Sequence, residues 1–301
     1  MSAPLRVARV GTARVAAQAK INLFLRILAR EESGYHSLET LFQRIDLADD
    51  VVVRVGGAIR SLDCAGPAMP SGGLGATESN LAFRAAESYA AATGWPSGFQ
   101  IEIEKRIPVG GGLGGGSADA GAVLRALDAL SPNRLGEARL IELATPLGAD
   151  VPFLTSSNAL SLAWGRGERL LALPPLEARD IVLVIPQFAV PTAEAYAWLA
   201  SSRGAYAPRG TAVALESLGA WPTIAALAHN DFEAVIAARQ PSVASIAEDL
   251  AARGASIAML SGSGSAVFGV FAEPPRTHSS GAAREILTRS AAKVFDVELS
   301  A

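Results

Sequence analysis

The amino-acid sequence predicts an α+β protein that is organised in two lobes. Strand-like segments dominate the part before a glycine-rich loop at 110–116, and apolar residues with helical spacing follow that loop. From about Ala159 onward, short strand-like segments alternate with helical ones. The chain has 301 residues, of which 50% are hydrophobic, and this is enough for two modest lobes with a sizeable core. We expect functional sites at the seam between the lobes.

The part before the loop is predicted to be mainly β-structure with one helix. Four segments have the composition or the apolar–polar alternation of strands: 15–28, 40–47, 51–55 and 99–104. Leu81, Ala85 and Tyr89 lie on or near one helical face, which predicts a helix over 80–93. The stretch 56–77 is rich in glycine and proline and is expected to form loops.

The glycine-rich loop is the most informative segment of the chain. Six glycines fall in the seven positions from Gly110 to Gly116, and the spacing of Ala120, Val123 and Leu127 predicts a buried helix that begins near Ser117. Because glycine has no Cβ, such a loop can turn its backbone N–H groups toward an anion, and a helix N-terminus adds donors and partial positive charge. The segment therefore predicts a polyphosphate site, that of a nucleotide.

The glycine-rich loop also fits two other interpretations. A surface turn without a ligand has the same composition. Gly110, Gly112 and Gly115 also satisfy the G-x-G-x-x-G spacing of dinucleotide-binding folds, although in those folds the motif normally lies in the opening strand–turn–helix unit. The P-loop pattern fails, because Ser117 follows Gly116 with no lysine between them. The cation that pairs with the phosphates is therefore expected elsewhere in the sequence.

The remaining elements are expected to be short. Helices are predicted at 137–145, 192–201, 231–238, 243–252 and 281–294. Strands are predicted at 160–163, 169–173 and 181–185, and a β-hairpin at 256–271. The segment 148–153 is predicted to be a loop, and 202–210 a flexible connection.

Composition excludes several classes of function. A formal net charge of −3 and the lack of a basic tract argue against nucleic-acid binding. Cys64 is the only cysteine, which permits no internal disulfide or multi-cysteine metal site and is typical of a reducing cytoplasm. The uncharged stretch 254–272 has eight Gly or Ser among its 19 residues, which predicts strand–turn–strand and not a membrane helix. We expect a soluble, cytoplasmic protein with no nucleic acid, membrane or obligate protein partner.

Several motifs occur in the order and spacing of a known kinase family. Three blocks resemble the GHMP kinase superfamily: Pro108–Ser117, Ala19–Leu23 and Leu260–Gly264. Three blocks are similar to the members that phosphorylate a cytidine diphosphate-linked methylerythritol: 19–25, 34–36 running into 40–43, and 148–152. The resemblance extends in order from Ala19 to about Phe271, which is nearly the whole chain.

The resemblance implies a fold and a reaction. The fold is the two-lobe GHMP kinase fold, with a ribosomal-protein-S5-like nucleotide and catalytic lobe over 1–160 and a ferredoxin-like α/β-plait lobe over 161–301. The reaction is phosphoryl transfer from ATP, with Mg²⁺, to the tertiary 2-hydroxyl of the acceptor, which gives the 2-phosphate and ADP. This is a step of the non-mevalonate (methylerythritol phosphate) route to isoprenoids.

The resemblance assigns Lys20 and Asp150 to catalysis. A lysine on an opening strand is ordinarily solvated, but Lys20 lies in an apolar run, which favours a buried or pocket-facing ammonium. Asp150, in Gly-x-Asp-x-Pro, would equally suit a turn or a helix cap. In the family, the aspartate accepts the proton of the substrate hydroxyl, and the lysine pairs with it and steadies charge on the transferred group.

The acceptor is expected to meet residues from three motifs. An exposed Tyr-His pair commonly has no ligand, but the resemblance implies that Tyr35 stacks on the cytosine and that His36 hydrogen-bonds its edge. Asn22 and Thr192 are weaker candidates for contacts to cytidine and the erythritol hydroxyls. The turn Ser261–Gly264 would otherwise be a simple hairpin tip, but in the family it lies beside the acceptor.

The nucleotide is expected to contact the glycine loop and its neighbours. The expected set is Pro108, Val109, Gly110, Gly111, Gly112, Leu113, Gly114, Gly115, Gly116, Ser117, Asn80 and Lys105. Lys105 and Arg106 would alternatively be solvated charges. Ser117 could offer its hydroxyl to Mg²⁺. Ala118 follows where many family loops have a second hydroxyl, and no acidic metal ligand is identifiable, so coordination would run mostly through phosphates and water.

Three rival functions accompany this interpretation. A superfamily kinase for another alcohol, such as homoserine or mevalonate, would not need the Tyr35–His36 pair. A silent nucleotide-binding protein on the same scaffold would not need both Lys20 and Asp150. A dinucleotide oxidoreductase rests only on the glycine spacing.

Overall fold

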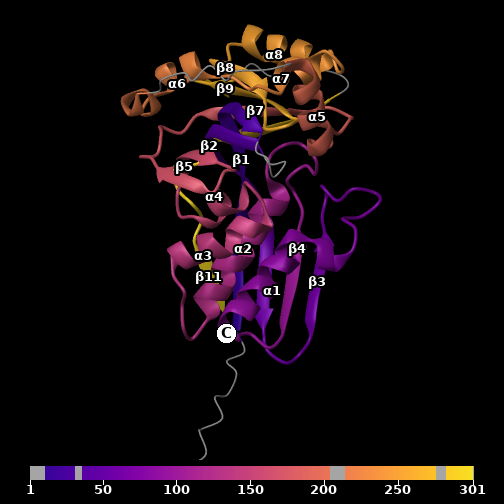
Figure 1. Ribbon diagram of the computed structural model, residues 1–301, viewed down its shortest axis with the longest axis vertical. Coiled ribbons are helices and arrows are strands. Elements are labelled where there is room, and N and C mark those ends of the chain that lie inside the picture. Colours follow the sequence, from indigo (N-terminus) through magenta and orange to yellow (C-terminus); the bar gives the residue numbers. More distant parts are fainter. Residues whose placement is uncertain (1–10, 31–35, 204–213, 276–282, 301) are drawn as a thin grey trace, which may run out of the picture.

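The computed structural model describes residues 11–30, 36–203, 214–275 and 283–300. Figure 1 shows an elongated molecule with a seven-stranded sheet and α1–α4 in its lower part, and a four-stranded sheet with α5–α8 in its upper part. The predicted α+β architecture in two lobes is confirmed. Tyr35 and most of the segment 202–210 lie outside the described residues.

A long antiparallel hairpin forms the spine of the larger sheet. Its strands β1 (Gly11–Arg30) and β2 (His36–Val55) are paired along almost their whole length. The sheet order is β11-β1-β2-β4-β3, and β5 pairs with β2 and with β6. The other strands are β3 (Arg60–Ala65), β4 (Phe99–Glu104), β5 (Leu160–Gly165), β6 (Arg169–Ala172) and β11 (Val297–Ser300). In β4 the apolar residues are buried and the polar ones exposed, as the alternation predicts.

Helices pack on the larger sheet. The central helix is α2 (Gly115–Leu130), which contacts β1 and β2 and has α1 (Leu81–Thr93) and α4 (Val151–Thr155) beside it. The helix α3 (Glu137–Ala144) contacts α4. Short 3₁₀ turns lie at Thr77–Ser79, Thr145–Leu147 and, in the other lobe, Leu215–Leu218.

The smaller sheet has the order β10-β7-β9-β8. Its strands are β7 (Asp180–Ile185), β8 (Ile257–Leu260), β9 (Val267–Phe271) and β10 (Arg284–Arg289). The helices on it are α5 (Thr192–Arg203), α6 (Trp221–Leu227), α7 (Glu233–Ala237) and α8 (Ser242–Ala252). Ile181 and Leu183 belong to the core that includes β1 and β2, whereas Val182 and Val184 belong to the core with α5, α7 and α8. Because both faces of β7 are buried, its sequence is uniformly apolar after Asp180.

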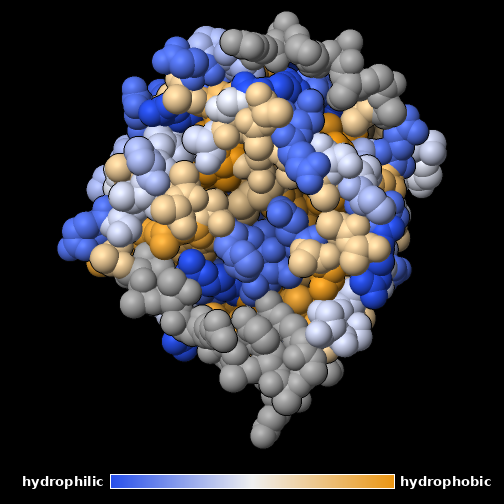
Figure 2. Space-filling model, turned by 90° about the horizontal axis from the view of Figure 1, so that it is seen from above, coloured by the Kyte–Doolittle hydropathy of each residue, from blue (hydrophilic) through white to orange (hydrophobic). Residues whose placement is uncertain are grey.

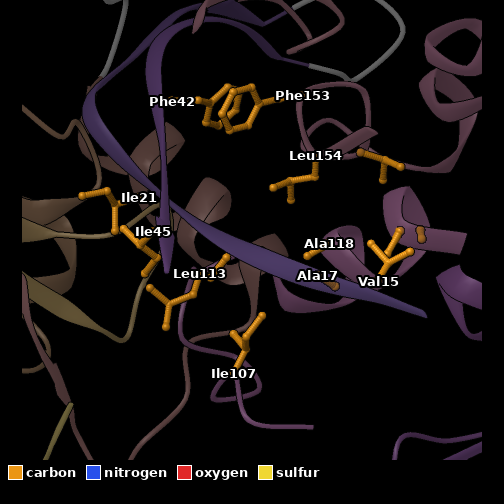
Figure 3. Packing of buried hydrophobic residues seen from close by; sticks show 14 of the residues in the cluster. Val15, Ala17, Ile21, Phe42, Ile45, Ile107, Leu113, Ala118, Phe153 and Leu154 are labelled. Carbon is orange, nitrogen blue, oxygen red and sulfur yellow. The ribbon is translucent and has the colours of Figure 1, made fainter. Parts of the chain in front are cut away.

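Residues from β1, β2, the glycine loop and α4 pack together in the core of the first lobe. In Figure 3, Phe42 from β2 and Phe153 from α4 lie face to face with Leu154 near them, and Ile21, Ile45 and Leu113 lie together farther along the same core. The two rings are stacked with centroids 4.9 Å apart. The strands, the glycine loop and α4 therefore share one packed core.

A return segment brings the chain back to the larger sheet after β10. Ala291 N–H donates to the Arg44 carbonyl, and the Gln18 side chain bonds the backbone of Lys293 and Phe295. The segment then enters β11, which pairs with β1 from Thr12 to Val15. The larger sheet thus contains strands from both ends of the described chain.

Some predicted elements differ from the structure. The helix predicted at 281–294 is wrong, because 284–289 pairs antiparallel with β7 along its whole length and this tertiary pairing outweighs a weak helical spacing. The stretch 56–77 is not only loop, since β3 lies within it. The loop predicted at 148–153 is likewise only partly correct, because α4 begins at Val151. Strands beyond residue 160 also belong to the larger sheet, so residue 160 does not separate the two sheets. As a domain division, residue 160 stays a prediction.

The surface seen from the top of Figure 1 has hydrophilic and hydrophobic residues interspersed (Figure 2). Among the described residues, no helix combines the length and the apolar character that a bilayer span requires.

Close packing of α2 on α4 yields a stability prediction. A Cβ at Gly121 would lie 2.4 Å from the carbonyl oxygen of Leu154. We expect Gly121→Ala to lower the free energy of unfolding by about 1–3 kcal/mol in urea denaturation, because the two helices must move apart. Gly116→Ala is the control, since a Cβ there meets nothing closer than 3.9 Å. An equal loss in both variants would contradict this account.

Candidate active site

A cleft of about 1410 Å³ lies between the two lobes. It is lined by β1, the glycine loop, the start of α4, the start of α5 and the turn at 262–263. Lys20, Asn22, His36, Asp150 and Thr192, which the sequence singled out, all line it. The structure therefore brings together residues that are up to 172 positions apart in the sequence, the separation of Lys20 and Thr192.

The glycine loop is held by its carbonyl groups. Ser265 N–H and Ala266 N–H donate to Gly110 and Gly111, at 3.3 and 3.2 Å. The Ser261 hydroxyl donates to the Gly112 carbonyl at 3.1 Å. Lys20 N–H donates to the Leu113 carbonyl at 3.0 Å.

The N–H groups of the same loop are not used in this way. Among the described residues, no hydrogen bond is donated by the backbone of 110–117. Because the helix α2 begins at Gly115, its first N–H groups add to this set. Gly112 has φ +74°, and a Cβ there would lie 2.1 Å from the Ser261 carbonyl oxygen, so a side chain is excluded at this contact. The loop therefore keeps its backbone donors unused, and most of its residues line the cleft, as a polyphosphate site requires.

Lys20 and Asp150 form an ion pair beside this loop. The Lys20 Nζ lies 3.4 Å from the Asp150 Oδ2. Lys20 is 3% exposed and Asp150 is 30% exposed, so the ammonium is buried and the carboxylate reaches the cleft. The solvated interpretation of Lys20 is excluded.

The position of Asp150 resolves the cap interpretation. Asp150 is the residue that precedes α4, but its side chain makes no capping hydrogen bond. The carboxylate instead faces Lys20. The start of α4 thus positions the Asp150 carboxylate, which remains free of a capping hydrogen bond.

Asn22 belongs to a network that holds Lys20. Its Oδ1 accepts from Lys20 Nζ at 2.8 Å, and its amide nitrogen donates to the Thr40 hydroxyl at 2.8 Å. Thr40 donates in turn to the Phe24 carbonyl at 2.7 Å. All three side chains are buried. Asn22 thus lines the cleft while orienting the ammonium.

A group of aromatic rings lines one end of the cleft. The ring of His36 stacks on Tyr196 with centroids 4.4 Å apart, and Tyr196 meets the edge of Phe232 at 4.9 Å. Burial, and then the charge of Asp150, raises the pKa of Tyr196 to about 12. Sequence reasoning missed Tyr196. A signal was available, because Tyr196 lies one helical turn after Thr192 and therefore on the same face.

Thr192 and the turn at 261–264 lie together. The hydroxyls of Thr192 and Ser263 are 3.1 Å apart. The buried Asn230 donates its amide hydrogens to the carbonyls of Leu260 and Gly262, at 2.9 and 2.8 Å. A Cβ on Gly262 would lie 3.3 Å from Lys20 Nζ, so this turn packs directly against the ammonium of the ion pair.

A smaller pocket of about 220 Å³ lies on another side of the glycine loop. Its lining includes Asn80, Lys105, Pro108 and Asp119. Asn80 also caps α1, since its Oδ1 accepts from Ala82 N–H at 2.9 Å. The structure thus brings the three predicted neighbours of the adenosine to one pocket.

Lys105 is not a solvated charge. It is 2% exposed and pairs with Asp49 and with Asp119, the latter at 2.6 Å. Asp49 also accepts from the N–H groups of Arg106 and Ile107, which lead into the glycine loop. Asp119 Oδ1 is buried without a partner among the described residues. Sequence reasoning missed both aspartates, because nothing in the spacing of 49, 105 and 119 predicts their contact.

No cluster of three or more His, Cys, Asp or Glu residues that could hold a metal occurs in the described part of the chain. Ser117, in the first turn of α2, lines the cleft. An oxygen donor of this kind suits Mg²⁺ as one ligand beside phosphate and water oxygens.

Comparison with known proteins places this geometry in a family. The model of the GHMP kinases N terminal domain matches residues 80–158, and that of the GHMP kinases C terminal domain matches 212–293. A protein of Desulfotalea psychrophila named 4-diphosphocytidyl-2-C-methyl-D-erythritol kinase is 39% identical over 85% of this chain and 84% of its own length. A relative of the same name from Anaeromyxobacter sp. (strain K) is 43% identical over 91% and 85%.

Solved structures agree. A crystal structure of 4-(cytidine 5'-diphospho)-2C-methyl-D-erythritol kinase has a TM-score of 0.73 and 35% identity, and covers 92% of this chain and 99% of its own. A homoserine kinase from Cytophaga hutchinsonii has a TM-score of 0.66 at 16% identity, over 99% and 100%, which is a likeness of fold alone.

The buried triad Asp49–Lys105–Asp119 yields a pH prediction. Burial raises the pKa of Asp119 to about 7; Lys105 opposes this shift and Asp49 adds to it. Because the folded state binds this proton more tightly than the unfolded state, where the pKa is about 3.9, the stabilising contribution is complete below pH ~4 and is lost as the pH rises through 7. We expect the stability of the wild type, relative to Asp119→Asn, to fall between pH 5 and 8.

The measurement is urea denaturation of both proteins across that range. Asp63→Asn, an exposed aspartate on β3, serves as control and should follow the wild type. Parallel pH profiles for the wild type and Asp119→Asn would contradict the prediction.

Proposed function

Since this chain belongs to the GHMP kinase family, and matches its 4-diphosphocytidyl-2-C-methyl-D-erythritol kinases over most of its length, we infer that it phosphorylates the 2-hydroxyl of that cytidylyl substrate with ATP. The products are the 2-phosphate and ADP, and the reaction is a step of the methylerythritol phosphate pathway of isoprenoid biosynthesis. The observation that carries this conclusion is the Lys20–Asp150 pair, at 3.4 Å, beside a cleft-lining loop whose backbone N–H groups donate no hydrogen bond within the described part of the chain.

Asp150 is the proposed acceptor of the hydroxyl proton. An aspartate carboxylate is too weak a base to remove an alcohol proton early, so it receives the proton late, as the new P–O bond forms. Lys20 sits within reach of both Asp150 and the glycine loop, and its positive charge stabilises the charge on the transferred phosphoryl group. Its bond to Asn22 fixes the ammonium, so positioning and electrostatics supply most of the acceleration.

The proposed nucleotide site lies along 108–117. The loop N–H groups bind the phosphates, and the pocket of Asn80, Lys105 and Pro108 receives the adenosine. Bound together with ATP, Mg²⁺ would supply neutralisation of the phosphate charge. Ser117 is the protein oxygen proposed to contact it.

The proposed acceptor site lies at the other end of the cleft. His36 and Tyr196 present ring faces and edges suited to a base, and Tyr35 is the further aromatic predicted to stack on the cytosine. Thr192, with Ser263, offers hydroxyls to the erythritol. Use of ATP and a single cysteine support the proposed cytoplasmic location.

The substrate assignment is tested by coupled measurement of ADP release. We expect turnover with the cytidylyl methylerythritol and at least a 100-fold lower kcat/KM, roughly 3 kcal/mol, with mevalonate or homoserine, because neither carries a base for the aromatic site. Equal rates with mevalonate would overturn the assignment. Binding of NAD(H) in a fluorescence titration would instead favour an oxidoreductase.

The role of Asp150 is tested by Asp150→Asn. The amide has nearly the same shape but does not accept the proton, so kcat should fall on the order of 10³-fold while KM for ATP changes little. Glu142→Gln, which also lines the cleft but on α3, is the matched control and should keep near-normal kcat. Near-normal turnover of Asp150→Asn would show that the base is wrongly assigned.

The role of Tyr196 is tested by Tyr196→Leu. Loss of a stacking face should raise KM for the cytidylyl substrate about 5- to 100-fold, equivalent to ~1–3 kcal/mol, with KM for ATP unchanged. A variant whose two KM values rise together would point to a general loss of structure and not to base recognition.

A further inference from the structure

Arg44 is a buried cation of β2 that the reaction scheme above does not use. It is 0% exposed, and its guanidinium contacts no carboxylate among the described residues. Burial lowers its pKa well below the ordinary arginine value, and the charge of Arg125 acts in the same direction. A charge without a paired carboxylate is costly to bury, so its position calls for a compensating role.

The contacts of Arg44 converge on the end of one short helix. Its Nη2 donates to the carbonyls of Phe153 and Ser156, at 2.8 and 2.9 Å, and its Nε donates to the carbonyl of Asn158 at 3.0 Å. The carbonyls of Phe153 and Ser156 lie at the C-terminal end of α4, where negative partial charge collects, and the Phe153 carbonyl also accepts from the N–H and the hydroxyl of Ser156. Asp150 precedes the first residue of the same helix.

Arg44 also supports the other member of the ion pair. Its guanidinium lies 5.1 Å from the centre of the Phe153 ring, which stacks on Phe42 at 4.9 Å (Figure 3). Lys20 Nζ lies over that Phe42 ring, 5.6 Å from its centre. Lys20 and Arg44 are directly paired residues of β1 and β2, so their side chains project from the same face of the sheet.

We propose that Arg44 is a positioning residue for phosphoryl transfer: it anchors α4 by its C-terminal carbonyls and, through Phe153 and Phe42, sets Asp150 and Lys20 at their mutual distance. The inference rests on the proposed role of Asp150. It adds a residue that touches neither substrate, because the ring pair and α4 separate Arg44 from the cleft.

The first test is Arg44→Met, which keeps the length of the side chain and removes the donors. We expect kcat to fall about 10- to 100-fold, with KM for ATP and for the cytidylyl substrate within about twofold, because a displaced catalytic group slows the chemical step and leaves binding intact. Arg44→Lys, with one donor group, should lose less. Phe153→Leu keeps Arg44 and removes the ring, and should lower kcat about 3- to 10-fold in the same way, which keeps the test available if Arg44→Met does not fold.

Arg125→Met is the matched control. Arg125 is a second largely buried arginine, but its Nη1 bonds the Phe295 carbonyl of the return segment and not α4. We expect it to shift thermal melting about as much as Arg44→Met and to leave kcat within twofold. A loss of kcat equal to that of Arg44→Met would overturn the proposal.

A double variant separates positioning from stability. In the Asp150→Asn background, Arg44→Met should lower kcat by a clearly smaller factor than in the wild type, because one of the two groups that it positions is already gone. The same factor in both backgrounds would contradict the proposal even if each single variant slowed turnover. Near-normal turnover of Asp150→Asn alone would instead contradict the assigned base, so the two failures are distinguishable.

Discussion

The site depends on the hydrogen bonds that hold the carbonyl groups of the glycine loop. Its carbonyls at 110–113 are all engaged, three by the turn at 261–266 of the second lobe and one by Lys20 of β1. The backbone proposed to bind phosphate is thereby joined to both lobes, and its N–H groups stay without a partner among the described residues. A backbone site of this kind needs glycine where two backbone segments touch, as Gly112 and Ser261 do. It also needs the two lobes to keep a fixed position relative to the loop.

Buried charges make this arrangement costly and well defined. Lys20, Lys105 and Arg44 are all buried, and each has different partners. Lys20 meets Asn22 and Asp150, and Lys105 meets two aspartates. Arg44 meets helix-end carbonyls, and its Nη1 has no partner among the described residues. Each buried ion costs several kcal/mol in desolvation that only good geometry offsets. The ions therefore add little net stability, but they penalise any displacement of the groups that they contact. A site whose chemistry consists of positioning and charge gains from this rigidity.

The sequence predicts the parts of the site that are carried by local pattern. The glycine loop, the helix behind it, and Lys20 and Asp150 follow from motifs in order, and the two-lobe α+β fold follows from the change in periodicity at about 159. Contacts between residues far apart in the sequence form only on folding, and local sequence pattern does not predict them. Nothing in the sequence around Lys105 distinguishes it from a solvated lysine. Its partners Asp49 and Asp119 come from different elements and meet it only in the folded protein. Likewise the 284–289 segment becomes a strand only because β7 offers an edge.

The return of the chain to β1 has a consequence for biosynthesis. Until residues 297–300 have left the ribosome, the edge of β1 at Thr12–Val15 has no partner in β11, although most of the larger sheet and the entire smaller sheet are already made. At elongation rates of about 5–20 residues per second, that interval lasts many seconds for the early strands. An unpaired edge is a template for association with other nascent chains. The residues that complete the larger sheet are thus synthesised after those of the smaller sheet.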